Sequence, residues 1–287
     1  MRLKDLAVQF SNSLSSTYGK QEADAIFLLV IDQLLKYTRS DYLRNKEEVI
    51  PEHQLKELLD IESQLTTGRP LQYVLGETFF YGLPFKVNPA VLIPRPETEE
   101  LVEWVLEQAM LTEISGGTMR IIDIGTGSGC IAVSLKKNLP HSKVTALDVS
   151  PEALATAASN ATLNQVEVNF INADIRAFTT DQKFDVIVSN PPYITMEEQQ
   201  SMHENVLSHE PHLALFVANE RPLEFYEVIA DFAWTNLSDF GYLFFEINEN
   251  LGKETIEMLT IKSFINITLK KDMQGKDRMI CCQKRII

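Results

Sequence analysis

The stretch RIIDIGTGSGC at residues 120–130 decides the fold of the larger part of this 287-residue chain. Its apolar first half, residues 120–124, is typical of a buried strand, and a helical pattern begins at Cys130. Between them lie three alternating glycines, which let the backbone approach a ligand and leave free N–H groups at the helix start. The stretch therefore predicts a strand, a ligand-binding turn and a helix.

Further strands and helices alternate downstream of this stretch. Strand-like runs lie at 144–147, 166–171, 184–188 and 242–247, and helical segments lie near 151–163, 196–207 and 222–237. This alternation predicts a parallel sheet covered by helices on both faces. Two last runs, 264–269 and 278–283, flank a polar turn around Gly275, and we interpret them as an antiparallel hairpin that closes the sheet.

Upstream of the sheet the pattern differs. Residues 1–75 have helical periodicity without interleaved strands, so we expect a small helical N-terminal domain. Residues 76–93 combine aromatic and β-branched side chains with a Gly and a Pro, which predicts a hairpin linker. A helix should begin at Pro96. The domain that contains the sheet is then expected at 94–287.

Composition excludes several classes of function. The chain has 26 basic and 40 acidic residues, a net charge of −14, so we expect no direct nucleic-acid partner. No apolar run approaches the roughly 20 residues of a membrane helix and no signal peptide is visible, so we expect a cytoplasmic protein without a membrane partner. His203, His209 and His212 lack metal-ligand spacing, and the three cysteines form no ligand set, so no metal is predicted.

The turn at 125–129 and the acids around it favour S-adenosylmethionine as the cofactor. Cys130 occupies the position where a dinucleotide-binding fingerprint needs a small residue. Asp123, two residues before the first glycine, suits a cationic aminoacyl group and would repel a pyrophosphate. Asp148 ends the next strand, where a carboxylate can accept both hydroxyls of a ribose. A glycine turn without a ligand is the alternative, and the two acids disfavour it.

The third strand adds two candidates to this cofactor site. Asp174 follows it, where the carboxylate could reach an adenine amino group, although Asp is also a common turn residue. Ile175 could pack on the adenine ring. The cofactor-binding residues predicted from these patterns are Asp123, Gly125, Thr126, Gly127, Ser128, Gly129, Asp148, Asp174 and Ile175.

The tetrapeptide Asn190-Pro191-Pro192-Tyr193 ends the fourth strand and is the predicted reacting site. Ligands of open α/β sheets bind at the carboxyl ends of strands. The two prolines remove two backbone donors, so the Asn190 amide and the Pro191 carbonyl form a fork for an NH₂ group. Such a fork would aim an amide or amine nitrogen at a methyl sulfonium, with the Tyr193 ring covering the substrate. A plain turn after a strand is the alternative.

The chain resembles the PrmC (HemK) family in six runs. They are RPLQYVLG at 69–76, VLIPRPETEELVE at 91–103, DIGTGSGCIAVSL at 123–135, SNPPYI at 189–194, HEP at 209–211 and GKDR at 275–278. The resemblance implies a class I S-adenosylmethionine-dependent methyltransferase with a Rossmann-like, seven-stranded, mostly parallel sheet. It implies in addition that the helical N-terminal domain at 1–75 helps to recognise the substrate. It also implies that the substrate is the glutamine amide in the Gly-Gly-Gln motif of class 1 peptide chain release factors, in translation termination.

The resemblance also implies roles for particular residues. Residues Gly125 to Gly129, Asp148 and Asn190 would bind S-adenosylmethionine, and Asn190 to Tyr193 would hold the glutamine. Ile175 departs from the family pattern, because some relatives have an aromatic residue against the adenine.

Three more residues come with the family pattern and are expected to border the site. They are Arg95, Glu97 and Thr98, and the first two are expected to contact the substrate. A structural alternative exists for each, because Arg95 could pair with a carboxylate and Glu97 could complement a helix dipole.

Two other functions are compatible with these motifs. A nucleic-acid N(6)-adenine methyltransferase would need the same fork, because its exocyclic amine also carries two N–H groups. The negative net charge argues against it. A non-catalytic module that binds S-adenosylmethionine would need only the glycine turn, and the intact tetrapeptide disfavours it.

Overall fold

The structure is a computed structural model that describes residues 1–111, 118–195, 197–201 and 204–285. It divides into two compact units, residues 1–76 with 203–209, and residues 77–202 with 210–287. None of the helices in the described ranges has the length and apolar character needed to cross a lipid bilayer.

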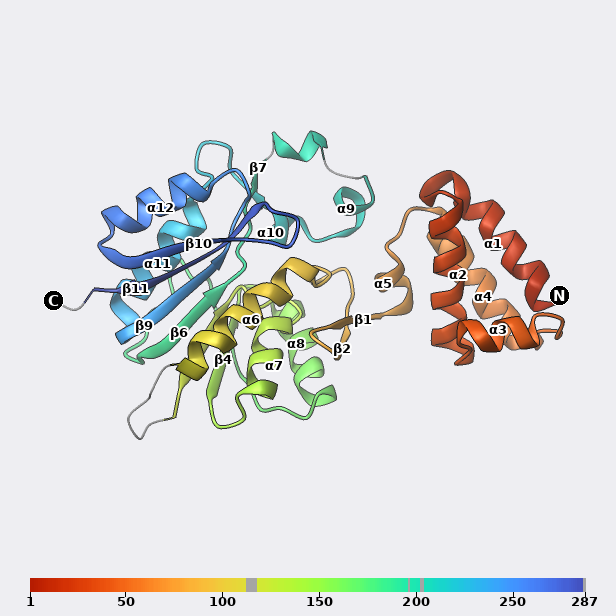
Figure 1. The fold of residues 1–287 in the computed structure, drawn as a ribbon, viewed down its shortest axis with the longest axis horizontal. Coiled ribbons are helices and arrows are strands. Elements are labelled where there is room, and N and C mark those ends of the chain that lie inside the picture. Colours follow the sequence, from red (N-terminus) through yellow and green to blue (C-terminus); the bar gives the residue numbers. More distant parts are fainter. Residues whose placement is uncertain (112–117, 196, 202–203, 286–287) are drawn as a thin grey trace. The chain divides into compact units, whose positions relative to one another are not determined.

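The first 76 residues form helices around an apolar core of their own (Figure 1). The helices are α1 (Leu3–Tyr18), α2 (Lys20–Leu35), α3 (Arg39–Asn45), α4 (Glu52–Thr66) and α5 (Leu71–Leu75). Leu6, Phe10 and Leu14 recur at helical spacing in α1 and are fully buried. The ring of Phe10 packs edge-on against Phe27 of α2, with 5.3 Å between ring centres. The predicted helical N-terminal part is confirmed.

A seven-stranded sheet organises the second unit, in the order β10-β11-β9-β6-β3-β4-β5 (Figure 1). The strands are β3 (Arg120–Ile124), β4 (Lys143–Asp148), β5 (Asn169–Asn172), β6 (Phe184–Ser189), β9 (Leu237–Glu246), β10 (Phe264–Lys271) and β11 (Asp277–Lys284). β11 runs antiparallel to both of its neighbours, and the other pairs are parallel. The predicted mostly parallel sheet with an antiparallel closing hairpin is confirmed.

Helices cover both faces of this sheet (Figure 1). One face carries α6 (Pro96–Leu111), α7 (Cys130–Asn138) and α8 (Pro151–Leu163), and the other carries α11 (Glu224–Asn236) and α12 (Gly252–Ile261). Side chains of a strand alternate between its two faces. Accordingly, Ile121 belongs to the apolar cluster under α6 and α7, and Ile122 belongs to the cluster under α11 and α12.

A hairpin of β1 (Glu77–Phe80) and β2 (Leu83–Lys86) precedes α6. Phe80 and Phe85 are buried in the cluster under α6 and α7. The fully buried Asn160 of α8 donates to the carbonyl oxygens of Lys86 and Ser128 at 3.0 and 2.9 Å. The hairpin is thereby tied to the glycine turn. The boundaries of the linker at 76 and 93 stay a prediction.

Some elements differ from the sequence analysis. The expected helix 196–207 is described as the short η1 (Glu198–Ser201) and α9 (Glu204–His209), while residues 196, 202 and 203, including His203, lie outside the described residues. Helices α10 (His212–Leu215) and α12 and the two-residue strands β7 (Ile194–Thr195) and β8 (Phe216–Val217) were not predicted. Most of these elements are too short for a periodic pattern to reveal.

Candidate active site

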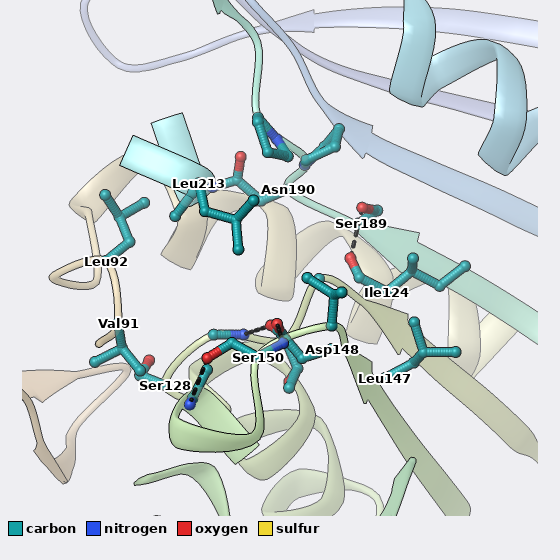
Figure 2. Close-up of a pocket in the computed structure, with 18 of the residues that line it drawn as sticks. Val91, Leu92, Ile124, Ser128, Leu147, Asp148, Ser150, Ser189, Asn190 and Leu213 are labelled. Carbon is teal, nitrogen blue, oxygen red and sulfur yellow. Dashed lines mark hydrogen bonds between the residues drawn. The ribbon is translucent and has the colours of Figure 1, made fainter. Parts of the chain in front are cut away.

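A cavity of about 350 Å³ lies at the carboxyl ends of β3, β4 and β6. The chain places β4 and β6 on opposite sides of β3, so the strand order reverses here, where open α/β sheets bind ligands. Figure 2 shows Asn190 and Leu213 on one side of this cavity and Asp148 and Ser150 on the other. The cavity therefore brings the predicted cofactor turn and the predicted reacting tetrapeptide together.

The glycine turn lines the cavity with backbone that only glycine adopts easily. Gly125, Gly127 and Gly129 have φ of 74°, 54° and 79°, which strains other residues. A Cβ added at Gly125 or Gly127 would have no atom within 4 Å, so both leave an open cradle. At Gly129 it would lie 2.9 Å from the Cβ of Ala157, so this glycine lets α7 pack closely on α8.

Asp148 connects the end of β4 to this turn. Its Oδ2 accepts the backbone N–H of Gly127 at 2.8 Å, and its Oδ1 accepts that of Ser150 at 2.9 Å. Each carboxylate oxygen has a second lone pair, and the residue lines the cavity. Asp148 thus fixes the turn and can still accept hydroxyl groups of a ligand.

Asp123 lies behind the turn and is not among the residues that line the cavity. Its carboxyl is fully buried, and the hydroxyl of Thr126 donates to its Oδ2 at 2.5 Å. Burial raises the pKa of Asp123 to about 7, although the Thr126 hydrogen bond lowers it. The structure shows this side chain holding the turn, and its direct contact with a cofactor stays a prediction.

Asp174 and Ile175 both line the cavity, beyond the end of β5. The guanidinium of Arg176 donates to the two carboxylate oxygens of Asp174 at 2.6 and 3.0 Å. Its central carbon also lies 5.9 Å from the ring centre of Phe225, another lining residue. The Asp174 carboxylate is therefore already paired, and its contact with an adenine stays a prediction.

The residues after β6 form the facing wall. Asn190, Pro191 and Pro192 line the cavity. The hydroxyl of Ser189 donates to the carbonyl of Ile124 at 2.6 Å, which ties the end of β6 to β3 (Figure 2). This bond fixes the point at which the tetrapeptide leaves the sheet.

Tyr193 is not among the lining residues, in contrast to the three residues before it. Its hydroxyl donates to Oε1 of Glu246 at 3.2 Å, and its carbonyl accepts from Nδ2 of Asn248 at 3.2 Å. Burial and the nearby Glu246 charge raise the pKa of Tyr193. The predicted cover of the substrate by this ring stays a prediction.

Sequence analysis missed Glu246, which ends β9 beside β6 and is 1% exposed. Its Oε2 accepts the hydroxyl of Thr98 at 2.6 Å. Burial raises the pKa of Glu246, while the Thr98 hydrogen bond and the charge of Arg278 lower it. An acid in an apolar strand, at the carboxyl end where ligands bind, was the available signal.

Arg95 and Glu97 have separate surroundings. Arg95 lines the cavity, and its guanidinium pairs at 2.6 Å with Glu210, whose side chain is 2% exposed. Glu97 does not line it and accepts from Nε2 of Gln274 at 3.2 Å. The ion pair considered for Arg95 is present, and substrate contact by either residue stays a prediction.

Several apolar lining residues were not predicted as site residues from the sequence. They come from the segment before α6, from α10 and from α11, and they include Val91, Leu92, Leu213, Ala214, Phe225 and Ile229. Each has the character of an ordinary core residue. Only the folded arrangement shows that they face a cavity.

Two family models match the chain. The PrmC N-terminal domain matches residues 5–76, and the Methyltransferase small domain matches residues 105–214. The second match contains both the glycine turn and the tetrapeptide that begins at Asn190.

Curated relatives match almost the whole chain. The release factor glutamine methyltransferase of Flavobacterium psychrophilum is 47% identical over 98% of this chain and 98% of its own length. That of Bacteroides thetaiotaomicron is 40% identical over 95% and 96%. A solved methyltransferase from Pyrococcus furiosus superposes with a TM-score of 0.53 at 18% identity, over 82% of this chain and 100% of its own. This last likeness shows a shared fold.

Proposed function

The chain belongs to the family of release factor glutamine methyltransferases, and from that premise we propose how its residues carry out methyl transfer. The reaction converts the side-chain amide of a release factor glutamine to N(5)-methylglutamine and leaves S-adenosylhomocysteine. When bound, S-adenosylmethionine supplies a methyl group made electrophilic by a positively charged sulfur. The acceptor is the glutamine of the Gly-Gly-Gln motif in class 1 release factors.

The glycine turn and Asp148 hold the cofactor in this proposal. The open cradle at Gly125 and Gly127 leaves room for a ligand against the backbone. The free lone pairs of Asp148 suit ribose hydroxyls. Ile175 and Phe225 add apolar surface for a base. These features fit the hydroxyl groups and the apolar base of S-adenosylmethionine.

Asn190 and Pro191 hold the acceptor. The side-chain oxygen of Asn190 and the carbonyl of Pro191 each accept one N–H of the glutamine amide. Fixing both hydrogens turns the nitrogen toward the methyl group, and positioning of this kind provides up to roughly 7–11 kcal/mol in well-aligned systems. The proton that the methylated nitrogen releases leaves to solvent. The observation that carries this proposal is that Asn190 and the glycine turn line one cavity.

The remaining parts of the chain have supporting roles. The helical domain at 1–75 helps to hold the release factor, the hairpin at 76–93 links it, and the domain at 94–287 carries out catalysis. The match of residues 5–76 to the PrmC N-terminal domain supports this division. The proposal includes no direct nucleic-acid partner, in keeping with the net charge of −14, and no membrane partner.

Mass spectrometry tests the function. A purified class 1 release factor incubated with enzyme and S-adenosylmethionine should gain one methyl group on its Gly-Gly-Gln glutamine, and a factor with Glu at that position should gain none. An unmodified factor, from enzyme that methylates another acceptor, would refute the proposal. A mobility shift with DNA or RNA at low salt would favour the adenine methyltransferase. Cofactor binding without turnover on any acceptor would favour the binding module.

A further inference from the structure

We propose that Thr98 and Glu246 set the direction in which Asn190 presents its side-chain amide, so that the amide oxygen faces the acceptor. The inference rests on the proposed function, because it concerns the residue that would hold the glutamine. Neither residue is assumed to touch the cofactor or the reacting atoms. They are positioning residues that act through Asn190.

The sheet brings Glu246 and Asn190 to the same level. β6 and β9 are parallel neighbours, and Ser189 is paired with Phe245 in their register. Asn190 directly follows β6, and Glu246 is the last residue of β9, so the two lie side by side. Thr98 reaches the same place from the first turn of α6, is 3% exposed and lines the cavity.

Counting protons decides the direction of the hydrogen bonds. The positive charge of Arg278 and two hydroxyl donors favour the ionised form of Glu246 against its burial. A carboxylate only accepts, and Glu246 accepts the hydroxyls of Thr98 at 2.6 Å and Tyr193 at 3.2 Å. The single proton of the Thr98 hydroxyl is used in that bond. What Thr98 offers to Asn190, 3.3 Å away, is a lone pair.

The Asn190 amide must therefore turn its NH₂ toward Thr98. The side-chain oxygen of Asn190 is then the end of the amide that does not contact Thr98. No side chain or backbone group of the described residues donates to this oxygen. The reversed amide would place an oxygen against the Thr98 oxygen and would present an NH₂ to the NH₂ of the glutamine. Glu246 thus fixes Thr98, and Thr98 fixes Asn190.

Substitution of Thr98 separates this role from packing. Thr98→Val keeps the shape and removes the acceptor, whereas Thr98→Ser keeps the hydroxyl and removes a methyl group. Thr255→Val is the matched control, because Thr255 is fully buried in α12, its hydroxyl donates to the Leu251 carbonyl at 2.7 Å, and it lies outside the cavity lining.

We expect Thr98→Val to lower kcat/KM for the release factor by about ten- to a hundredfold. Thr98→Ser and Thr255→Val should remain within about threefold of the unaltered enzyme, and calorimetry should give all variants a Kd for S-adenosylhomocysteine within about threefold. Normal kcat/KM in Thr98→Val, or equal losses in Thr98→Val and Thr98→Ser, would overturn the inference. If Thr98→Val does not fold, Thr98→Ala takes its place in the same comparison.

A spectroscopic measurement keeps this inference separate from the proposed function. The side-chain NH₂ signal of Asn190, assigned through its loss in Asn190→Asp, should exchange slowly with solvent in the unaltered protein and in Thr98→Ser. It should exchange faster in Thr98→Val. Equal exchange in all three would overturn the inference even if the release factor is methylated. Failure of the unaltered enzyme to methylate the factor would overturn the function, while the exchange result would still decide the orientation.

Discussion

The carboxylate of Asp148 accepts the backbone N–H of Gly127 at 2.8 Å, so the end of one strand fixes the turn that follows its neighbour. Gly127 has no side chain, so the carboxylate lies directly against the backbone of the turn. Because the same carboxylate also lines the cavity, the shape of the turn and the recognition of a ligand depend on one residue.

Asp148→Ala should therefore weaken S-adenosylhomocysteine binding about ten- to a hundredfold, because it removes a charged acceptor and the anchor of Gly127. Asp174→Ala is the comparison, and it should cost less than about tenfold because Arg176 already occupies that carboxylate. Calorimetric titration measures both. Normal affinity in Asp148→Ala would contradict the assignment of this residue to the cofactor.

Asn190→Ala should lower methyl transfer by at least about a hundredfold while cofactor binding survives in weakened form. The reason is that the glycine turn stays intact, whereas the glutamine amide loses one of its two acceptors. Methylation assays and calorimetry on the same preparation check both halves. Asn138→Ala, at the end of α7 and outside the cavity lining, is the control. Substantial turnover by Asn190→Ala would show that the fork is not at this residue.

Two glycines of the same turn should respond differently to alanine. Gly127→Ala should cost about 1–2 kcal/mol of unfolding free energy, because it adds only backbone strain at positive φ. Gly129→Ala carries that strain as well and forces a Cβ to 2.9 Å from Ala157, so it should cost about 1–3 kcal/mol more. Urea unfolding of the two variants measures the difference. Equal losses would show that α7 and α8 can separate without cost.

The features that sequence analysis predicted have local causes. The spacing of hydrophobic residues distinguishes strands from helices. The glycines between 125 and 129 lie where a strand pattern ends and a helix pattern begins. The tetrapeptide at 190–193 follows a strand. Parallel topology alone therefore predicts that it lies at the edge of the sheet where ligands bind. Each of these inferences needs only a short stretch of chain.

The features that were not predicted from the sequence depend on contacts between distant segments. Glu246 contacts Thr98 because the pairing of β9 with β6 and the position of the start of α6 bring the two residues together. No short stretch of sequence contains both residues.

The alternation of side chains along β3 explains why Asp123 does not line the cavity. It lies on the same face as Ile121, toward α7, whereas Ile124 lies on the opposite face and lines the cavity.

Asp123 should make the stability of the chain depend on pH. Its pKa is about 7, compared with an ordinary value of 3.8, mainly because its carboxyl is fully buried. The charge of Asp148 raises the pKa further, and the Thr126 hydrogen bond opposes the rise. Between these pH values the folded chain keeps a proton that the unfolded chain has lost. The unfolding free energy should therefore fall as the pH rises from about 4 to about 7.

Asp123→Asn tests this dependence, because asparagine cannot titrate and keeps an oxygen for the Thr126 hydroxyl. Relative to the unaltered protein, the variant should gain on the order of 2–3 kcal/mol of unfolding free energy between about pH 5 and about pH 8. Urea unfolding of both proteins at each pH gives this difference, in which the titration of distant groups cancels. A difference that stays the same at both pH values would show that the folded chain does not hold a proton on Asp123, so burial would not control this carboxyl.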